Sequence, residues 1–272
     1  MEHIDLKLPN GKDYLSYSSG KHMATHPVSY LAYMKDKFEP SEAMIFGTFY
    51  EALLCEPHTI DDKYTIFSES NLVEQAEKDY GKPTKNIRAT KVYKDLKEAA
   101  LKDLNPEYVI SEEEYEKALK MALIMTESGV FDEHLNGDYQ MVNTGIVSSE
   151  NYVAKALCKS DVVIGGGERV IDLKTTSSVL DGFLSQGKKL GYDLQAFLSM
   201  EIWGVEEFTF VVQRTQGLLD VGVFKIHEGS WFYESGKSKW EKALVNYKSF
   251  FSEDAIALQI NPSNYVLYQE IF

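Results

Sequence analysis

The sequence predicts a protein of the α/β (α+β) class, with a central mixed β-sheet flanked by helices. The chain has 272 residues with 44% hydrophobic and 12% aromatic content, enough to bury a large core. Runs rich in β-branched residues fill 140–174 and return at 207–227, and helical patterns stand before, between and after them. The order helix, three strands, helix, strand, strand is typical of a mixed sheet with packed helices.

The first half of the chain is mostly helical by its pattern. Ser41 and Ser111 are typical helix N-caps, and Pro27 and Pro57 interrupt or end helices. In chain order we expect helices over 15–25, 28–37 and 41–56, a short strand at 64–67, and helices over 71–78, 91–103 and 111–127. We expect residues 1–272 to form a single domain, within which 58–135 is a helical insertion.

The second half carries the sheet. The expected elements are strands at 140–148, 152–164 and 169–174, helices over 179–187 and 192–203, strands at 207–214 and 218–227, and a helix over 233–251.

A hairpin at 161–174 gathers two acids and a lysine. If Gly165–Glu168 form a four-residue loop, Asp161 faces Asp172, and directly opposite residues have Cβ atoms only ~5 Å apart. Asp172 and Lys174 are two residues apart, so they share a face of the strand. Like charges this close are unfavourable without a cation between them, and hard oxygen ligands suit Mg²⁺ or Mn²⁺.

Composition excludes several classes of protein. No apolar run is long enough to span a membrane, and we see no secretory signal. Cys55 and Cys158 are predicted to be buried free thiols in a reducing compartment. The net charge of −14 opposes non-specific nucleic-acid binding, although an acidic protein can carry a local basic groove. The best candidate for such a DNA-backbone patch is the basic run that includes Lys85, Arg88 and Lys91.

Two apparent motifs are rejected. His22 and His26 have the spacing of a helical metal pair, but Pro27 argues against one continuous helix. Ser235–Ser238 resembles the end of a phosphate-binding loop, yet the leading glycine is absent, because Trp231 stands at that position.

Glu51 lies on a mostly apolar side of its predicted helix. A buried acid needs a partner or a metal, because burying its charge alone is costly. The alternative is a glutamate at the boundary of an amphipathic helix.

Taken together, these motifs resemble the PD-(D/E)XK nuclease superfamily, and more narrowly its RecE-like (exonuclease VIII type) and RecB-like phage exonucleases. The superfamily pattern of an acid, a gap of about ten residues and (D/E)-x-K is similar to Asp161, Asp172 and Lys174. The RecE-like motifs are matched by Asp172–Thr176, by Tyr192–Ala196, by Ser16, Ser18, Pro27 and Tyr30, and by Gly47–Pro57. Glu51 stands where relatives usually have histidine, and Gln140 where many have glutamate.

The resemblance implies a restriction-endonuclease-like core and a metal-dependent deoxyribonuclease. It implies that Mg²⁺, with Mn²⁺ able to substitute, is bound by Asp161, Asp172, Glu51 and the Leu173 main-chain carbonyl. Lys174 would then hold the attacking water or a phosphate oxygen, and Gln195 would orient the water or phosphate, with Tyr192 packed nearby.

The resemblance further implies an ATP-independent 5′→3′ exonuclease acting on double-stranded DNA ends. It implies a ring-shaped homo-oligomer, a single-strand-annealing recombinase as partner, and a phage or prophage protein in the cytoplasm of a bacterial host. One alternative is a RecB-like nuclease acting on single strands or beside a helicase. Another is a non-catalytic DNA-binding or assembly protein that keeps the fold.

Overall fold

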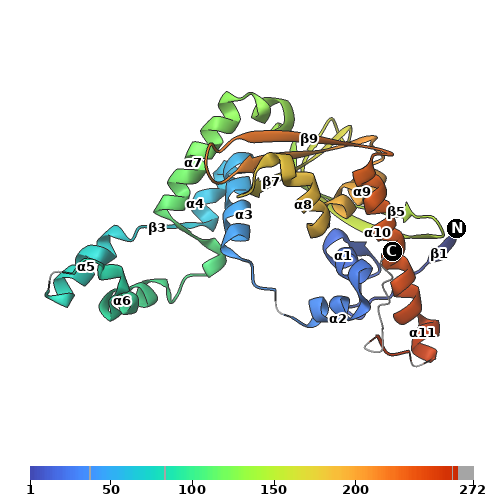
Figure 1. Ribbon diagram of the computed structural model, residues 1–272, viewed down its shortest axis with the longest axis horizontal. Helices are drawn as coiled ribbons and strands as arrows, with labels where there is room; N and C mark the ends of the chain where they lie inside the picture. The colour runs from blue at the N-terminus through green and yellow to red at the C-terminus, as the bar shows by residue number, and fades with distance from the viewer. Residues whose placement is uncertain (37, 83, 259, 263–272) are drawn as a thin grey trace, which may run out of the picture. The chain divides into compact units, whose positions relative to one another are not determined.

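The computed structural model describes residues 1–272 except 37, 83, 259 and 263–272, and it divides into two compact units (Figure 1). The first unit comprises Met1–Phe38 and Asp132–Phe272, and the second comprises Glu39–Phe131. The predicted insertion at 58–135 falls largely within the second unit. Its description as an insertion in a single domain stays a prediction.

A seven-stranded mixed sheet forms the centre of the first unit, which confirms the predicted class. The strand order is β1-β6-β7-β8-β9, and β2 and β5 also pair with β6. β7 and β8 run parallel, whereas β5–β6, β6–β7 and β8–β9 are antiparallel. The strands are β1 (Glu2–Ile4), β2 (Leu15–Ser16), β5 (Asp138–Ser148), β6 (Tyr152–Ile164), β7 (Arg169–Thr176), β8 (Glu207–Arg214) and β9 (Val221–His227).

Helix α9 (Tyr192–Trp203) lies against this sheet, where it contacts β5, β6, β7 and β8. α1 (Tyr17–Thr25) and α10 (Trp231–Phe250) pack on α9 in turn. Every residue of α9 from 193 to 200 is consequently buried, and the polar side chains of this stretch need partners inside the protein. The other helices of the unit are α2 (Pro27–Lys35), α8 (Phe183–Leu190) and α11 (Glu253–Ala257).

The contact between α9 and α10 depends on the sequence that looked like part of a phosphate-binding loop. A Cβ at Gly236 would lie 2.2 Å from the carbonyl oxygen of Asp193. The Ser235 hydroxyl donates a 2.7 Å hydrogen bond to Asp193 Oδ2, and Lys239 Nζ pairs with Asp193 Oδ1 at 2.6 Å. Ser235, Gly236 and Lys239 therefore dock one helix on another, and this packing role accounts for their presence.

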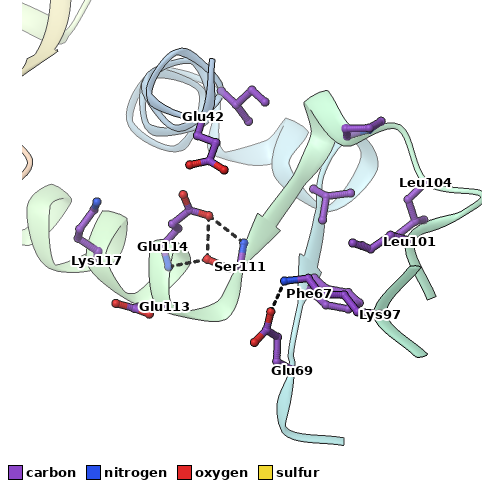
Figure 2. Close-up of a pocket in the computed structure, with 13 residues that line it drawn as sticks. Glu42, Phe67, Glu69, Lys97, Leu101, Leu104, Ser111, Glu113, Glu114 and Lys117 are labelled. Carbon is purple, nitrogen blue, oxygen red and sulfur yellow. Dashed lines mark hydrogen bonds and ion pairs between the residues drawn. The ribbon is translucent and has the colours of Figure 1, made fainter. Parts of the chain in front are cut away.

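The second unit is mainly helical. Its helices are α3 (Glu42–Cys55), α4 (Ile60–Lys63), α5 (Ser70–Tyr80), α6 (Lys91–Leu101) and α7 (Glu112–Glu127). β3 (Thr65–Phe67) and β4 (Val109–Ser111) form a two-stranded parallel sheet. Ser111 begins α7 with a reciprocal capping box to Glu114, which confirms the predicted N-cap. A pocket of about 600 Å³ in this unit has the Ser111–Glu114 contacts and the Glu69–Lys97 ion pair in its wall (Figure 2).

Short turns complete the chain. They are η1 (Pro57–Thr59), η2 (Ile87–Ala89), η3 (Pro106–Tyr108) and η5 (Leu180–Gly182), which are 3₁₀ helices, and η4 (Phe131–Leu135), a π-helical turn.

Several smaller expectations have clear outcomes. Cys55 and Cys158 are both buried free thiols, as predicted. The helix expected over 28–37 is α2, which ends at Lys35, and residue 37 lies outside the described part of the chain. No described helix is both long and apolar enough to cross a bilayer.

Candidate active site

The β6–β7 hairpin has the predicted register. Ile164 pairs with Arg169, which leaves Gly165–Glu168 as the four-residue loop. The three glycines of this loop have φ angles of +67°, +69° and +118°, a region of backbone conformation that glycine adopts without steric cost. The next position in this register sets Asp161 opposite Asp172.

Five predicted site residues meet at this point, although they come from three elements. The Leu173 backbone N–H donates a 2.9 Å hydrogen bond to Asp161 Oδ2, which links β7 to β6. The Gln195 side-chain amide of α9 donates to Asp172 Oδ1. Lys174 Nζ forms an ion pair with Asp172 Oδ2. Asp172 is thus the centre of the cluster.

Asp172 and Lys174 are both strongly perturbed by their surroundings. The Asp172 side chain is 1% exposed, and burial, followed by the neighbouring Asp161 charge, raises the pKa of Asp172 to about 7. Burial alone would lower the pKa of Lys174, but Asp172 and Asp161 outweigh burial and raise that pKa above its usual value. The pair therefore consists of a buried carboxyl group whose pKa lies near 7 and an ammonium group that stays charged at neutral pH.

Two buried acceptor atoms at the site lack hydrogen bonds. Among the described residues, Gln195 Oε1 has no donor, and Asp172 Oδ2 has the Lys174 ion pair but no hydrogen bond. A buried acceptor without a donor is unfavourable by about 1–3 kcal/mol. A water molecule or a metal-bound water would satisfy these atoms.

Tyr192 packs beside the cluster. Lys174 Nζ lies 5.2 Å from the centroid of the Tyr192 ring, a cation–π arrangement. Burial raises the pKa of the Tyr192 hydroxyl, so this hydroxyl stays neutral. The ring therefore confines Lys174 without adding another charge.

The donor set fits a hard divalent cation. Asp161 and Asp172 supply carboxylate oxygens, and the main-chain carbonyl of Leu173, whose N–H contacts Asp161, is a third oxygen ligand that the resemblance implies. Within the described residues, no group of three or more His, Cys, Asp or Glu side chains lies in a metal-binding arrangement. Gln140 lies between the Tyr139–Val162 and Met141–Ser160 pairs of β5 and β6 and has a φ of +55°.

The remaining predicted site residues belong to the second unit. Glu51 is half-buried on α3, and its role as a metal ligand stays a prediction. Lys85, Arg88 and Lys91 are exposed, and Arg88 Nε pairs with Glu69 at 3.2 Å. Part of this basic run is therefore neutralised within the protein, and its contact with DNA stays a prediction.

The histidine pair is not a metal site. His26 ends α1 and caps α2 by accepting a hydrogen bond from the Val28 N–H on Nδ1. His22 stacks on Tyr33, with ring centroids 4.6 Å apart. The helix break that Pro27 predicts is present, and it separates the two histidines.

Sequence reasoning missed two residues beside the cluster, Tyr17 and Lys21 of α1. The Tyr17 ring lies 6.4 Å from the Tyr192 ring, and Lys21 Nζ lies 4.9 Å from the Tyr17 centroid. About 150 residues separate them from Lys174, so no local pattern could have placed them here. The Ser-x-Ser motif before them marked the start of α1 but gave no indication of its neighbours.

Comparison with protein families identifies the family of this chain. The family model described as PDDEXK-like domain of unknown function (DUF3799) matches residues 16–255. The chain belongs to this family of PDDEXK-like domains, which confirms the resemblance to the PD-(D/E)XK superfamily. A comparison with curated protein sequences finds no match.

Solved structures were compared with the chain, and one of those described here shares its fold. A candidate exonuclease from Eubacterium rectale matches with a TM-score of 0.55 and 15% identity, over 95% of this chain and 91% of that one. A phage related exonuclease from Haemophilus somnus 129PT gives a TM-score of 0.33 at 18% identity, over 72% and 99% of the two chains. An alkaline exonuclease from Laribacter hongkongensis gives 0.29 at 11% identity, over 75% and 96%. The first of these supports the fold assignment, and the other two scores are too low to add to it.

Proposed function

We propose that this protein is a metal-dependent DNA exonuclease that hydrolyses phosphodiester bonds. The observation that carries the proposal is the convergence of Asp161, Lys174 and Gln195 on the buried Asp172. A structural hairpin gains nothing from two facing carboxylates, because like charges at this distance repel. Such an arrangement is useful when a cation binds between them.

Asp161, Asp172, the Leu173 carbonyl and Glu51 are the proposed ligands of one or two Mg²⁺ ions, for which Mn²⁺ can substitute. When bound, the ion supplies a Lewis acid that lowers the pKa of a water and neutralises charge on the phosphate. The side chains do the rest of the positioning. Lys174, held by Asp172 and confined by Tyr192, offers its ammonium to a non-bridging phosphate oxygen or to the attacking water.

Gln195 has a distinct part in the proposal. Its Nε2 is committed to Asp172, whereas its Oε1 is buried and available to accept a hydrogen bond. An acceptor in this position orients a water by binding one of its protons. α9 is packed on both sides, so the amide is held rigidly, which favours catalysis by preorganisation.

The choice of substrate rests on the resemblance to RecE-like exonucleases. We propose double-stranded DNA ends, 5′→3′ polarity, independence from ATP, a ring-shaped homo-oligomer and a recombinase that anneals the single strands produced.

The test is digestion of end-labelled DNA by the wild type and by Asp172→Ala and Lys174→Gln. We expect Mg²⁺-dependent loss of the 5′ label from linear duplex without ATP, no cutting of circular duplex, and a decrease in kcat of at least about 10²-fold in both variants. Digestion of single strands alone would support a RecB-like activity instead. If Lys174→Gln digests as fast as the wild type, the activity does not come from this site, and a non-catalytic DNA-binding protein becomes the better reading.

A further inference from the structure

Lys21 is a half-buried cation without a carboxylate partner. Six other cations of the first unit are in ion pairs, namely Lys7, Lys155, Arg214, Lys225, Lys239 and Lys248. In the part of the chain that the structure describes, Lys12 and Lys188 also lack a carboxylate partner, but unlike Lys21 they are exposed. Among the described residues, no acid makes an ion pair with Lys21, in a chain whose acids outnumber its basic residues by 42 to 28. Lys21 Nζ lies over the Tyr17 ring, and cation–π contacts are worth only about 0.5–1 kcal/mol at exposed sites.

Lys21 is placed close to the catalytic cluster. Lys174 lies over the Tyr192 ring, Tyr192 lies beside Tyr17, and Lys21 lies over Tyr17. Burial, and after it the positive charge of Lys174, lowers the pKa of Lys21, so each of the two ammonium groups lies within the electrostatic field of the other. Two like charges held on either side of a tyrosine pair suit a ligand that carries repeated negative charges.

The position of Lys21 is also fixed. A Cβ at Gly191 would lie 3.2 Å from Lys21 Cβ and 3.3 Å from both Lys21 Cδ and Tyr17 Cε2. The lysine stem and the tyrosine ring therefore pack directly on the backbone of Gly191, the residue that precedes α9. The Tyr17 hydroxyl donates to the Leu190 carbonyl at 3.1 Å, which holds the ring. A side chain held in this way loses little conformational entropy on binding.

We propose that Lys21 is a substrate-positioning residue that binds a DNA phosphate neighbouring the one at Lys174. The ligand chemistry is a phosphodiester backbone, which a compact ammonium recognises as a point charge without reading sequence. This inference rests on the proposed nuclease function and adds to it a second contact with the DNA backbone, next to the contact at Lys174. It also shows how a protein of net charge −14 can hold a polyanion, because an unneutralised cation matters more locally than the total charge.

The experiment compares the wild type with Lys21→Met, Lys21→Arg and Lys155→Met in Mg²⁺-dependent digestion of linear duplex at several salt concentrations. Met keeps the stem and removes the charge, Arg restores a charge, and Lys155 is a matched control because it is paired with Asp13. For Lys21→Met we expect KM to rise about five- to tenfold with kcat within twofold, because a contact to a neighbouring phosphate contributes equally to substrate and transition state. The slope of log(kcat/KM) against log[salt] should become less negative by about 0.9, and Lys21→Arg should recover most of both effects.

Thermal unfolding provides the second readout. Lys21→Met should melt at or above the wild-type temperature, because it removes a partly buried charge without a carboxylate partner. A lower melting temperature with an unchanged salt slope would show a structural role and overturn the inference. Wild-type activity with identical KM and slope in Lys21→Met would overturn this inference alone, whereas a wild type that leaves duplex uncut would overturn the proposed function itself.

Discussion

Asp172 combines burial with charge in a way that affects stability as well as chemistry. An acid buried next to another acid is most stable protonated, and here the folded-state pKa is about 7 against a usual value of 3.8. In the folded protein Asp172 therefore holds its proton over a pH range in which the unfolded chain has released it. The stability that this proton contributes is fully present below about pH 3.8 and is lost as the pH rises through about 7.

The prediction is that metal-free wild type becomes less stable as the pH rises from 5 to about 7, by about 1.4 kcal/mol for each pH unit, and changes little above that pH. Asp172→Asn cannot ionise, so its free energy of unfolding should fall less over the same range. Urea denaturation in EDTA at several pH values measures both. Asp181→Asn, at an exposed aspartate, is the control and should follow the wild type. Parallel pH profiles for Asp172→Asn and wild type would contradict the raised pKa.

At the scale of elements, the packing of α10 on α9 positions the Gln195 side chain in the site. Asp193 has no exposed surface, and its carboxylate is satisfied by Ser235 and Lys239 of α10. Gln195 is only two residues further along α9. Any shift of α10 therefore moves the amide that contacts Asp172.

We predict that Gly236→Ala lowers the free energy of unfolding by about 1–3 kcal/mol, because the new methyl group would lie 2.2 Å from the Asp193 carbonyl oxygen. Gly182→Ala is the matched control, since no atom would lie within 4 Å of the added Cβ. Chemical denaturation of both variants is the measurement. Equal stability of Gly236→Ala and wild type would mean that the two helices separate easily, and that Gln195 is less rigidly held than proposed.

Elements with local determinants were predicted well from the sequence. The hairpin register follows from three glycines between β-branched runs, and the α7 capping box follows from Ser111 and Glu114. β1, β2 and β4 were missed because each is two or three residues long and pairs in parallel with a distant strand. A segment this short carries no periodicity, so of these short strands only β3, expected at 64–67, was predicted.

The same distinction applies to the site. Asp161, Asp172 and Lys174 lie on one hairpin, so their meeting could be derived from strand geometry. Gln195 could be placed only through its sequence motif. Lys21 could be placed neither by strand geometry nor by a motif, because the position of Lys21 depends on how α1 packs on α9. Tertiary packing of separate elements is what a single sequence specifies least directly.

At the scale of the whole molecule, the role of Glu51 as a metal ligand can be tested separately from the other proposed ligands. Glu51 belongs to the second unit, whereas the other proposed ligands belong to the first. We predict that Glu51→Gln weakens Mg²⁺ binding, while Glu42→Gln, an exposed acid at the start of the same helix, leaves it unchanged. The measurement is the rise in melting temperature with Mg²⁺, which at 100 times the Kd corresponds to about 2.7 kcal/mol in wild type. An identical Mg²⁺ titration for Glu51→Gln would remove Glu51 from the ligand set.

The pairing of β1 with β6 has a consequence for the protein as it is synthesised. Glu2 lies beside Tyr152 in the sheet, so the first strand of the chain has no partner until about 150 more residues have left the ribosome. At about 5–20 residues per second, that wait lasts roughly 8–30 s. All of Glu39–Phe131 emerges during this interval. We therefore expect the helical unit to become compact first, and β1 to pair with β6 in the sheet afterwards.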